Sequence, residues 1–391
     1  MIILGPLFPE EREQEIISAS KRGVSNAANN FQWNLIKGIL ANTDEPLIVI
    51  NALPVGTWPK NFKTFHLKDT DWFCNGITGH ELGCYNIPLV KQFMRMRKTR
   101  ALLKKYPDEK EILIFTAYLP FLWAVSKIDP EYKVTAVITD IPEFYDMHSV
   151  STVRKILRKI HCKIVYHFMV RVNRFVLLTE QMTEPLHVCG RPYIVMEGVC
   201  GNVVPEMSDL KQSSFSLLYT GRLNRRYGLE YLLNAMKKLD DPDIELWLCG
   251  SGEMEEEIKA YAKVDSRIKF FGFLPHDKTL SLQRQATVLV NPRTNEGEYT
   301  KYSFPSKTME YMVSGRPVMM FKLDGVPREY DQYLTYIPAE NVEAICQTVQ
   351  FLKKLKPYEL DELGSKGRDF VLKNKNRDVQ MKKILDFMDE E

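Results

Sequence analysis

The chain has 391 residues, which is enough for two domains with separate cores. Its 45% hydrophobic and 26% charged residues are ordinary globular values, and a formal net charge of +3 is too small to indicate nucleic-acid binding. The seven cysteines are scattered without a CxxC pair, so they indicate neither a disulfide framework nor a zinc site and favour a reducing cytoplasm.

The beginning of the chain, MIILGPLFPEEREQE, becomes acidic too early for a signal peptide. No apolar run approaches the ~20 residues that a membrane-spanning helix requires. We therefore expect a soluble, cytoplasmic protein that can still bind peripherally to the inner face of a membrane.

Apolar strand-like runs alternate with helical patterns along the whole chain. Continuous apolar strands that alternate with helices predict parallel sheets covered on both faces. The strands expected in the first half are residues 2–4, 47–52, 112–117, 134–139, 175–179 and 193–197. The strands expected in the second half are residues 216–220, 245–249, 268–273, 288–291, 318–321 and 334–337.

A polar stretch at residues 205–214 interrupts this rhythm, and we interpret it as a linker between domains. The prediction is an α/β protein with two doubly wound Rossmann-like domains that face a central cleft. Residues 1–205 form the first domain and residues 206–374 the second. The C-terminal helix, residues 375–391, is expected to pack back on the first domain.

Two segments of the first half are strongly basic. Residues 91–105 carry seven Lys or Arg and no acid, and residues 153–175 carry seven more among apolar side chains. Such basic amphipathic segments suit an anionic membrane surface, and the alternative is a pair of helices that bury their apolar stripes. Few aromatic residues interleave with these charges, which argues against a platform for single-stranded nucleic acid.

Ligands bind at the carboxyl ends of strands in doubly wound folds, and this rule selects the loops after the strands of the second half. The loop at residues 221–228 contains two glycines and three arginines, whose forked donors suit phosphate oxygens. The alternative is a solvated turn. A second tight loop, residues 250–253, is a weaker indication, and a third covers residues 292–305.

The third loop leads into a helix that we expect to begin near Ser303 and to end at Gly315. Pro305 suits a first helical turn, whereas Lys307 opposes the helix dipole there. A bound anion would resolve this conflict, because free backbone N–H groups and a cation would converge on it. The alternative is a solvated lysine on an ordinary helix start.

Residues 216–330 resemble the donor-binding domain of glycosyltransferase family 4, which comprises retaining transferases of the GT-B fold. The matching pieces are YTGRL, LCGSGE, FFGFLPH, VLVNPR and YSFPSKTMEYMVSGRPVM, of which the last corresponds to the family's glutamate–seven–glutamate signature. VITDIPE, FVLLTEQM and VMEGV are looser matches in the first half. The resemblance implies a glycosyltransferase, hexosyltransferase-like and metal-independent, that takes a sugar from a UDP-sugar, or from a GDP-sugar as the alternative. The acceptor would be a glycan or lipid-linked saccharide in cell-surface polysaccharide synthesis, with no cofactor.

The resemblance also implies roles for single residues. Glu310 corresponds to the glutamate that holds the nucleotide ribose, and Arg222 to the arginine that contacts the donor diphosphate. The donor site would comprise Gly221, Arg222, Arg226, Phe273, Leu274, Glu298, Tyr302, Ser303, Phe304, Pro305, Ser306, Lys307 and Glu310. The catalytic residues would be Asp140, Arg222 and Arg226, and the acceptor side would comprise Gly23, Ser25, Asn26 and Asp140.

The chain departs from the family pattern at several positions. Tyr302 stands where the first glutamate of the signature should bind hydroxyls of the transferred sugar, and Glu296 or Glu298 is a candidate replacement. Tyr227 stands where the family has a lysine, so the second diphosphate cation is missing, and Arg226 or Arg225 are candidates to supply it.

The sequence pattern lacks a convincing metal-binding DxD motif, so cationic side chains and a helix N-terminus would stabilise the departing diphosphate. Two other functions remain open. A sugar-nucleotide epimerase or hydrolase could use the same fold, and a non-catalytic nucleotide-sugar-binding protein would be consistent with Tyr302. A dehydrogenase is disfavoured because no strand-to-helix turn carries GxGxxG followed by an acidic residue.

Overall fold

The computed structural model describes residues 1–21, 26–144, 152–200 and 214–390. The chain divides into two compact units. Unit 1 contains Met1–Met196 and Arg377–Glu391, and unit 2 contains Glu197–Asn376. The units change at residues 196/197 and 376/377, whereas the sequence prediction placed the boundaries at residues 205 and 374.

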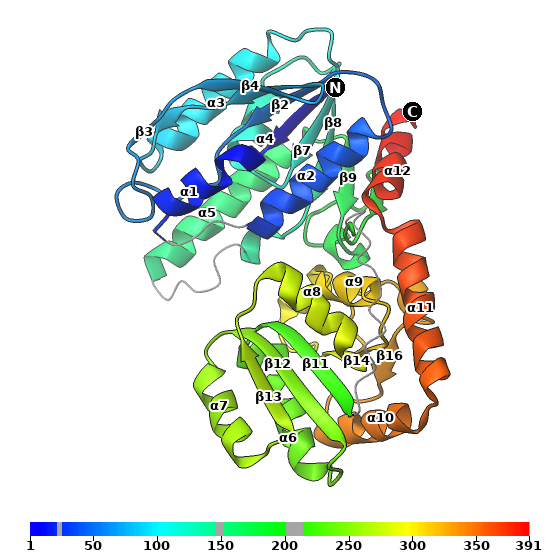
Figure 1. The fold of residues 1–391 in the computed structure, drawn as a ribbon. Helices are drawn as coiled ribbons and strands as arrows, with labels where there is room; N and C mark the ends of the chain where they lie inside the picture. Colours follow the sequence, from blue (N-terminus) through cyan, green and yellow to red (C-terminus); the bar gives the residue numbers. More distant parts are fainter. Residues whose placement is uncertain (22–25, 145–151, 201–213, 391) are drawn as a thin grey trace. The chain divides into compact units, whose positions relative to one another are not determined.

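Unit 1 is built on an eight-stranded sheet with the strand order β10-β9-β8-β7-β1-β2-β5-β4 (Figure 1). All neighbours pair in parallel except β4, which lies antiparallel to β5 and forms one edge. The central strands are fully buried, as their unbroken apolar sequences predict. The strands are β1 (Ile2–Gly5), β2 (Leu47–Asn51), β4 (Thr70–Cys74), β5 (Ile77–Glu81), β7 (Glu111–Phe115), β8 (Lys133–Ile138), β9 (Arg174–Leu177) and β10 (Tyr193–Val195). A separate antiparallel pair joins β3 (His66–Leu67) to β6 (Cys84–Tyr85).

Helices cover both faces of this sheet. α2 connects β1 to β2, which lies on one side of β1 in the sheet. α3, α4 and α5 lead to β7, β8 and β9, which follow one another in the opposite direction. Because such crossovers are right-handed, α2 lies on one face of the sheet and α3, α4 and α5 lie on the other. The helices are α1 (Glu13–Ala19), α2 (Asn26–Leu40), α3 (Val90–Leu103), α4 (Leu119–Val125), α5 (Thr152–Met169) and α12 (Arg377–Asp389). The short 3-10 helices are η1 (Glu10–Arg12), η2 (Pro142–Phe144) and η3 (Glu180–Thr183).

The C-terminal helix α12 packs on α2 within unit 1. Gly38 makes the close approach feasible, because a Cβ there would lie 2.5 Å from the Met381 side chain and 2.7 Å from the Arg377 carbonyl oxygen. The Asn42 side-chain amide donates to the Asp378 carbonyl at 2.9 Å and closes the contact. The last helix of the chain is therefore part of the first unit.

Unit 2 contains a six-stranded parallel sheet with the order β13-β12-β11-β14-β15-β16. Its strands are β11 (Phe215–Arg222), β12 (Ile244–Ser251), β13 (Ile268–Gly272), β14 (Val288–Asn291), β15 (Val318–Phe321) and β16 (Thr335–Ile337). Its helices are α6 (Leu229–Lys238), α7 (Glu255–Val264), α8 (His276–Gln285), α9 (Lys307–Val313), α10 (Val342–Lys354) and α11 (Pro357–Asn374), and its 3-10 helices are η4 (Arg225–Tyr227), η5 (Glu298–Tyr302) and η6 (Arg328–Tyr330).

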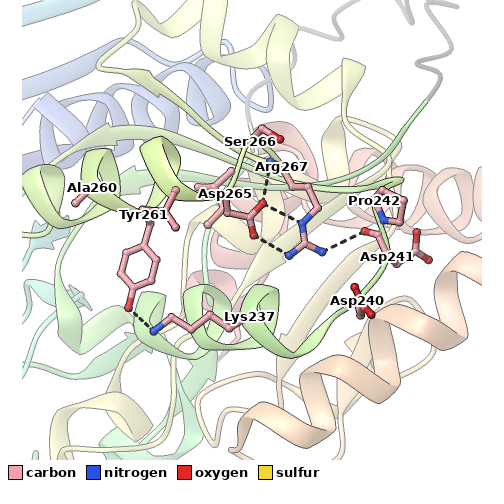
Figure 2. Close-up of a pocket in the computed structure, with 11 residues that line it drawn as sticks. Lys237, Asp240, Asp241, Pro242, Ala260, Tyr261, Asp265, Ser266 and Arg267 are labelled. Carbon is pink, nitrogen blue, oxygen red and sulfur yellow. Dashed lines mark hydrogen bonds and ion pairs between the residues drawn. The ribbon is translucent and has the colours of Figure 1, made fainter.

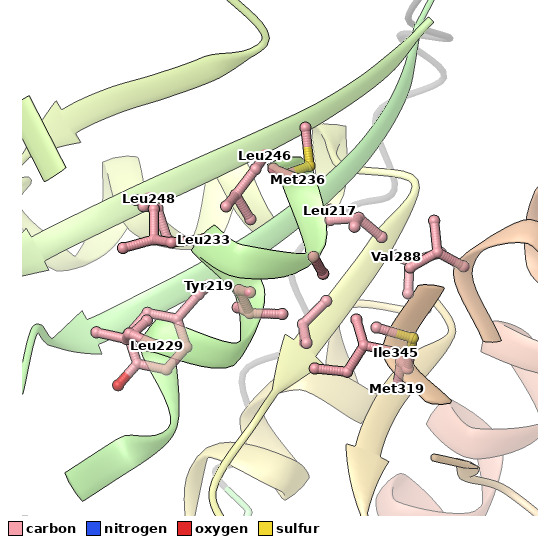
Figure 3. Packing of buried hydrophobic residues seen from close by; sticks show 14 of the residues in the cluster. Leu217, Tyr219, Leu229, Leu233, Met236, Leu246, Leu248, Val288, Met319 and Ile345 are labelled. Atoms are coloured by element: carbon pink, nitrogen blue, oxygen red, sulfur yellow. The ribbon is translucent and has the colours of Figure 1, made fainter. Parts of the chain in front are cut away.

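The core of unit 2 lies on both faces of this sheet, because successive residues of a strand point to opposite sides. Leu217 and Tyr219 of β11 join the cluster under α6 and α10 shown in Figure 3. Leu218 joins the opposite cluster with Trp247 and Tyr311, under α8, α9 and α11. The predicted α/β architecture of two doubly wound sheets is confirmed.

Candidate functional site

The carboxyl end of β11 lies beside the first residue of α9. Gly221 has φ +132°, and a Cβ at this position would lie 1.3 Å from Lys307 Nζ. The Lys307 ammonium donates to the Thr220 carbonyl and lies 5.0 Å from the centre of the Tyr219 ring. Glycine at residue 221 therefore makes room for a lysine that comes from a distant part of the sequence.

Lys307 has no carboxylate partner within ion-pair distance among the described residues. Burial lowers the pKa of its ammonium to about 8, although the charges of Glu310 and Cys249 raise it in part. A half-buried cation that contacts a backbone carbonyl and an aromatic ring, and forms no ion pair with a described residue, is suited to an anionic ligand.

Glu310 is fixed by a glutamine from α8. The buried Gln283 donates from Nε2 to Glu310 Oε1 at 2.5 Å and to Thr220 Oγ1 at 3.2 Å. The Gln283 Oε1 atom is buried and has no partner among the described residues. Gln283 thus orients the carboxylate, and the sequence prediction did not include it.

Tyr311 attaches α9 to the end of β11. Its hydroxyl accepts from the Thr220 backbone N–H at 2.9 Å and lies 3.2 Å from the Thr220 carbonyl oxygen. The side chain is fully buried, and burial raises the pKa of its phenol. This attachment holds Lys307 and Glu310 in place relative to residues 220 and 221.

A second half-buried cation, Arg293, follows β14, and the sequence prediction did not include it. Its Nη2 donates to Ser303 Oγ at 2.9 Å, and its guanidinium lies 5.2 Å from the centre of the Tyr299 ring. Its Nε atom is buried without a partner in the described part of the chain. Burial lowers the pKa of Arg293, and the positive charge of Arg226 lowers it further.

The three arginines of the 221–228 loop have different environments. Arg222 is exposed, and no hydrogen bond or ion pair of its side chain is found within the described residues. Arg226 is exposed, lies 5.0 Å from the Tyr227 ring centre and donates to the Tyr227 hydroxyl at 3.0 Å. Arg225 forms ion pairs with Glu230 and Glu257, so it is not available as the missing cation.

The helix expected near Ser303 begins at Lys307, and this expectation was wrong by one turn. Residues 303–305 are not helical, because Phe304 and Pro305 are buried, with the Phe304 ring 5.4 Å from that of Tyr330. The Tyr302 and Phe304 side chains are only 8% and 7% exposed, so they anchor this loop in the core.

The remaining residues predicted for the donor side have separate positions. Ser306 is exposed and precedes α9 as its N-cap, without a side-chain capping bond. Glu298 is exposed, 4.0 Å from Lys301. Phe273 is 77% exposed, whereas Leu274 packs against the core.

The predicted acceptor side belongs to unit 1. Asp140 follows β8, where it is exposed and accepts a hydrogen bond from the Thr139 hydroxyl at 2.9 Å. Asn26 is the first residue of α2, and Gly23 and Ser25 lie outside the described residues. Asp140 and the predicted donor side are therefore in different units.

A hollow of about 910 Å³ lies at the amino ends of β12 and β13 of unit 2 (Figure 2). Its two cations already have partners, because Arg267 pairs with Asp265 at 2.7 Å and Lys237 donates to the Tyr261 hydroxyl at 2.8 Å. Ligands of doubly wound sheets bind at the opposite, carboxyl ends. The candidate site is therefore the cation-rich end of β11 and β14 and not this hollow.

Among the described residues, no three His, Cys, Asp or Glu side chains gather as a metal site requires. No described helix is both long and apolar enough to cross a membrane.

Residues 214–354, within unit 2, match the family model described as Glycosyl transferases group 1. A protein of Methanocaldococcus jannaschii named as an uncharacterized glycosyltransferase is 27% identical over 172 residues. This similarity covers 42% of the present chain and 40% of the length of that relative.

Solved structures resemble the whole chain. Sucrose-phosphate synthase of Thermosynechococcus elongatus has a TM-score of 0.67 at 16% identity, covering 99% of this chain and 98% of that one. The trehalose-6-phosphate protein of E. coli bound with UDP-2-fluoro glucose has a TM-score of 0.67 at 9% identity, with both chains fully covered. An Anabaena protein in complex with UDP and glucose has a TM-score of 0.61 at 12% identity, covering 100% of this chain and 99% of that one.

The chain has the GT-B fold, with two Rossmann-like halves, and residues 214–354 of its second half match the glycosyl transferases group 1 model. Together with the named relative, these findings support a glycosyltransferase of the GT-B type. The expected fold class is confirmed at this level.

Proposed function

We propose that the chain is a retaining glycosyltransferase of family 4 that moves a sugar from a nucleoside diphosphate sugar to a glycan or lipid-linked acceptor. A UDP-sugar is the first choice of donor, and a GDP-sugar is the second. The observation that carries the proposal is the pair of half-buried cations, Lys307 and Arg293, which have no carboxylate partner within the described residues and lie at the carboxyl ends of β11 and β14.

The diphosphate of the donor is the anion that this end of unit 2 would bind. Lys307, Arg293, Arg222 and Arg226 form no ion pair with any described residue, so their charges are available to a ligand. Charge-assisted hydrogen bonds from guanidinium and ammonium groups to phosphate are stronger than neutral ones. The relatives bound to UDP or to a UDP-sugar support this assignment.

Arg293 can supply the positive charge that is missing at Tyr227. The cation that the family pattern would place at residue 227 is absent, and Arg225 is already paired with carboxylates. Arg293 lies near Tyr227, Tyr299 and Ser303. Its positive charge also acts on Tyr219, and Lys307 lies over the ring of the same tyrosine. We therefore assign Arg293 as the second diphosphate cation.

Glu310 is assigned to the ribose of the nucleotide. Gln283 occupies one of its oxygen atoms, and the carboxylate is otherwise partly exposed. A carboxylate held in this way can accept hydrogen bonds from vicinal hydroxyls, as acidic residues do in dinucleotide-binding folds. The exposed Phe273 and its neighbour Leu274 are assigned to the face of the base.

In a retaining transfer, the diphosphate leaves and the acceptor arrives on the same face of the sugar. The bond between the anomeric carbon and the diphosphate oxygen breaks, the acceptor oxygen forms a bond to that carbon, and the acceptor proton passes to the departing phosphate. Lys307, Arg293 and Arg222 stabilise the charge that develops on the diphosphate, which is the main requirement of this chemistry. Asp140 of unit 1 orients the acceptor or the sugar, and no metal takes part.

The test is donor consumption by the full chain with a panel of UDP-, GDP- and ADP-sugars and a mixture of glycan and lipid-linked acceptors. We expect one nucleotide sugar to be consumed only with an acceptor, and the product to keep the anomeric configuration of the donor by NMR. Donor consumption without an acceptor would indicate a hydrolase or epimerase. Binding without turnover for the whole panel would favour a non-catalytic binding protein.

The expected cellular role is the synthesis of a surface polysaccharide on the cytoplasmic side of a membrane. The support for this role is the expected acceptor class. It is tested by identifying the acceptor among extracted lipid-linked saccharides, since a purely soluble metabolite as acceptor would overturn it.

A further inference from the structure

Helix α5 of unit 1 carries an apolar stripe that faces solvent. Val153, Ile156, Leu157, Ile160 and Ile164 are 40–64% exposed, and their spacing places them along one side of the helix. The buried residues of α5 are Cys162, Val165 and Met169, all in its C-terminal half. The described residues of the unit therefore leave the apolar side chains of the N-terminal half exposed, a pattern that marks an interaction site.

The charges of α5 are all of one sign. The helix contains Arg154, Lys155, Arg158, Lys159 and Lys163 and no aspartate or glutamate. Basic side chains that flank an exposed apolar stripe are typical of a helix that lies in the interface of an anionic membrane. If two copies of the chain packed stripe against stripe, the positive charges of both α5 helices would lie close together. This repulsion disfavours self-association through α5.

A basic groove lies on the neighbouring helices of the same unit. It has a volume of about 440 Å³ and is lined by Phe93, Arg97, Arg100 and Ala101 of α3, by Lys104 directly after this helix and by Trp123 of α4. Arg97 lies 5.6 Å from the centre of the Phe93 ring, and the buried Arg100 Nε atom has no partner among the described residues. None of the described residues that line the groove is acidic, so it suits a phosphate group.

The other basic residues of α3 are structural. Lys91 donates to the Val55 carbonyl at 2.6 Å, and Arg95 donates to the Leu53 carbonyl at 2.8 Å. Both side chains are buried, and Lys98 pairs with Asp69 at 2.6 Å. Of the basic residues at 91–105, Lys91, Arg95 and Lys98 therefore have partners within the protein and are not available to a membrane.

The groove and the stripe belong to one layer of helices. α4 contacts both α3 and α5, and all three connect strands on the same face of the unit 1 sheet (Figure 1). Phe93 at 56% exposure adds an apolar side chain to the α3 side of this layer. We name this surface, formed by the α5 stripe and the groove at Arg97, Arg100 and Lys104, the α3–α5 face.

We infer that the α3–α5 face docks on a bilayer that contains anionic phospholipids. The α5 stripe enters the boundary between headgroups and acyl chains, and Arg97, Arg100 and Lys104 bind lipid phosphates in the groove. Neither step involves the residues of the donor site, so the docking does not rest on the proposed transfer reaction.

The test is sedimentation of the full chain with vesicles of phosphatidylglycerol and phosphatidylcholine, compared with vesicles of phosphatidylcholine alone. We expect binding to the anionic vesicles only, and weaker binding at high salt. The variant Ile156→Gln/Leu157→Gln/Ile160→Gln and the variant Arg97→Gln/Arg100→Gln/Lys104→Gln should each bind at least tenfold more weakly. Both should keep the wild-type circular dichroism and melting temperature, because the replaced side chains contribute little to the core.

Matched control variants change similar residues elsewhere. Lys263→Gln/Lys354→Gln/Lys366→Gln removes three exposed lysines of unit 2, and Val264→Gln changes a valine that is 91% exposed there. Both controls should bind anionic vesicles like the wild type. Equal binding to neutral vesicles, wild-type binding by folded α5 or groove variants, or a dimer that the α5 substitutions dissociate would each overturn the inference.

Discussion

The substitution Lys307→Met tests the cost of holding a charge at the end of β11. Its ammonium has a pKa of about 8 in the folded protein, against 10.5 for an unperturbed lysine, and burial is the main cause. Each pKa unit corresponds to about 1.4 kcal/mol, so the buried charge costs about 3 kcal/mol of stability at pH 7. Methionine has a similar shape and no charge, and Tyr311 still contacts the Thr220 carbonyl at 3.2 Å after the change.

We therefore expect the free variant to be more stable than the wild type by about 1–2 kcal/mol at pH 7, after allowance of ~1 kcal/mol for the lost hydrogen bond. Between pH 8 and 10.5 the unfolded chain binds a proton at Lys307 that the folded chain does not, so wild-type stability rises with pH in this window. The advantage of the variant should shrink accordingly. Above both pKa values the cost of the charge is absent.

The assay is urea unfolding of both proteins at pH 7 and pH 10, with calorimetric titration of nucleoside diphosphate at pH 7. The variant should lose at least tenfold in nucleotide affinity while it gains stability, a trade-off typical of functional charges. Lys263→Met, at an exposed lysine, should leave both quantities within error. A variant that is less stable at pH 7 by an amount that does not change at pH 10 would refute the burial reasoning. Undiminished nucleotide affinity would refute the role of Lys307.

Three further predictions concern neighbouring residues. Arg293→Ala should weaken nucleoside diphosphate binding at least tenfold by calorimetry, whereas Arg225→Ala should not, because carboxylates already hold that side chain; equal losses would contradict the assignment. Glu310→Gln should weaken nucleoside diphosphate binding and leave inorganic pyrophosphate affinity unchanged, and a matching loss for pyrophosphate would show that the carboxylate does not act on the ribose. Gly228→Ala should lower the free energy of unfolding by about 1 kcal/mol or more beyond the effect of Gly272→Ala. Both glycines have positive φ, but only at residue 228 would a Cβ lie 1.8 Å from a carbonyl oxygen, and equal losses would count against this packing argument.

The sheets were predictable because their strands are long apolar runs. Ile112–Phe115 and Leu246–Leu248 are buried on both faces. A strand of this kind is a continuous apolar run, so the local sequence is enough to predict it. The strands β3 to β6 were not predicted, since they are only two to five residues long and none of them is a continuous buried run. Their pairing depends on partners elsewhere in the chain.

The start of α9 was misplaced for a tertiary reason. Pro305 has the properties of a first helical residue, but Phe304 and Pro305 are buried in unit 2, and the helix begins only at Lys307. Tertiary contacts also explain the error in α3, where the sequence pattern predicted Lys91 and Arg95 as surface charges. Their partners are carbonyl groups of a loop about 40 residues away, which no local pattern reveals.

Two residues of the candidate site were missed. Arg293 lies in a loop that the strand-end rule had already selected, so a lone arginine directly after an apolar strand was a usable signal. Gln283 gave no comparable signal, because a glutamine in an amphipathic helix is ordinarily a surface residue. Only its contacts with Thr220 and Glu310 distinguish it.

The central claim is that the cation-rich end of unit 2 binds the diphosphate of a nucleotide sugar. Calorimetric titration of the full chain with UDP, GDP and ADP at pH 7 and pH 9 tests it most directly. We expect one saturable site with a preference for one base, and an affinity about tenfold lower at pH 9, because Lys307 with its pKa of about 8 is then mostly neutral. The absence of saturable binding for all three nucleotides, or an affinity that does not change with pH, would contradict the claim.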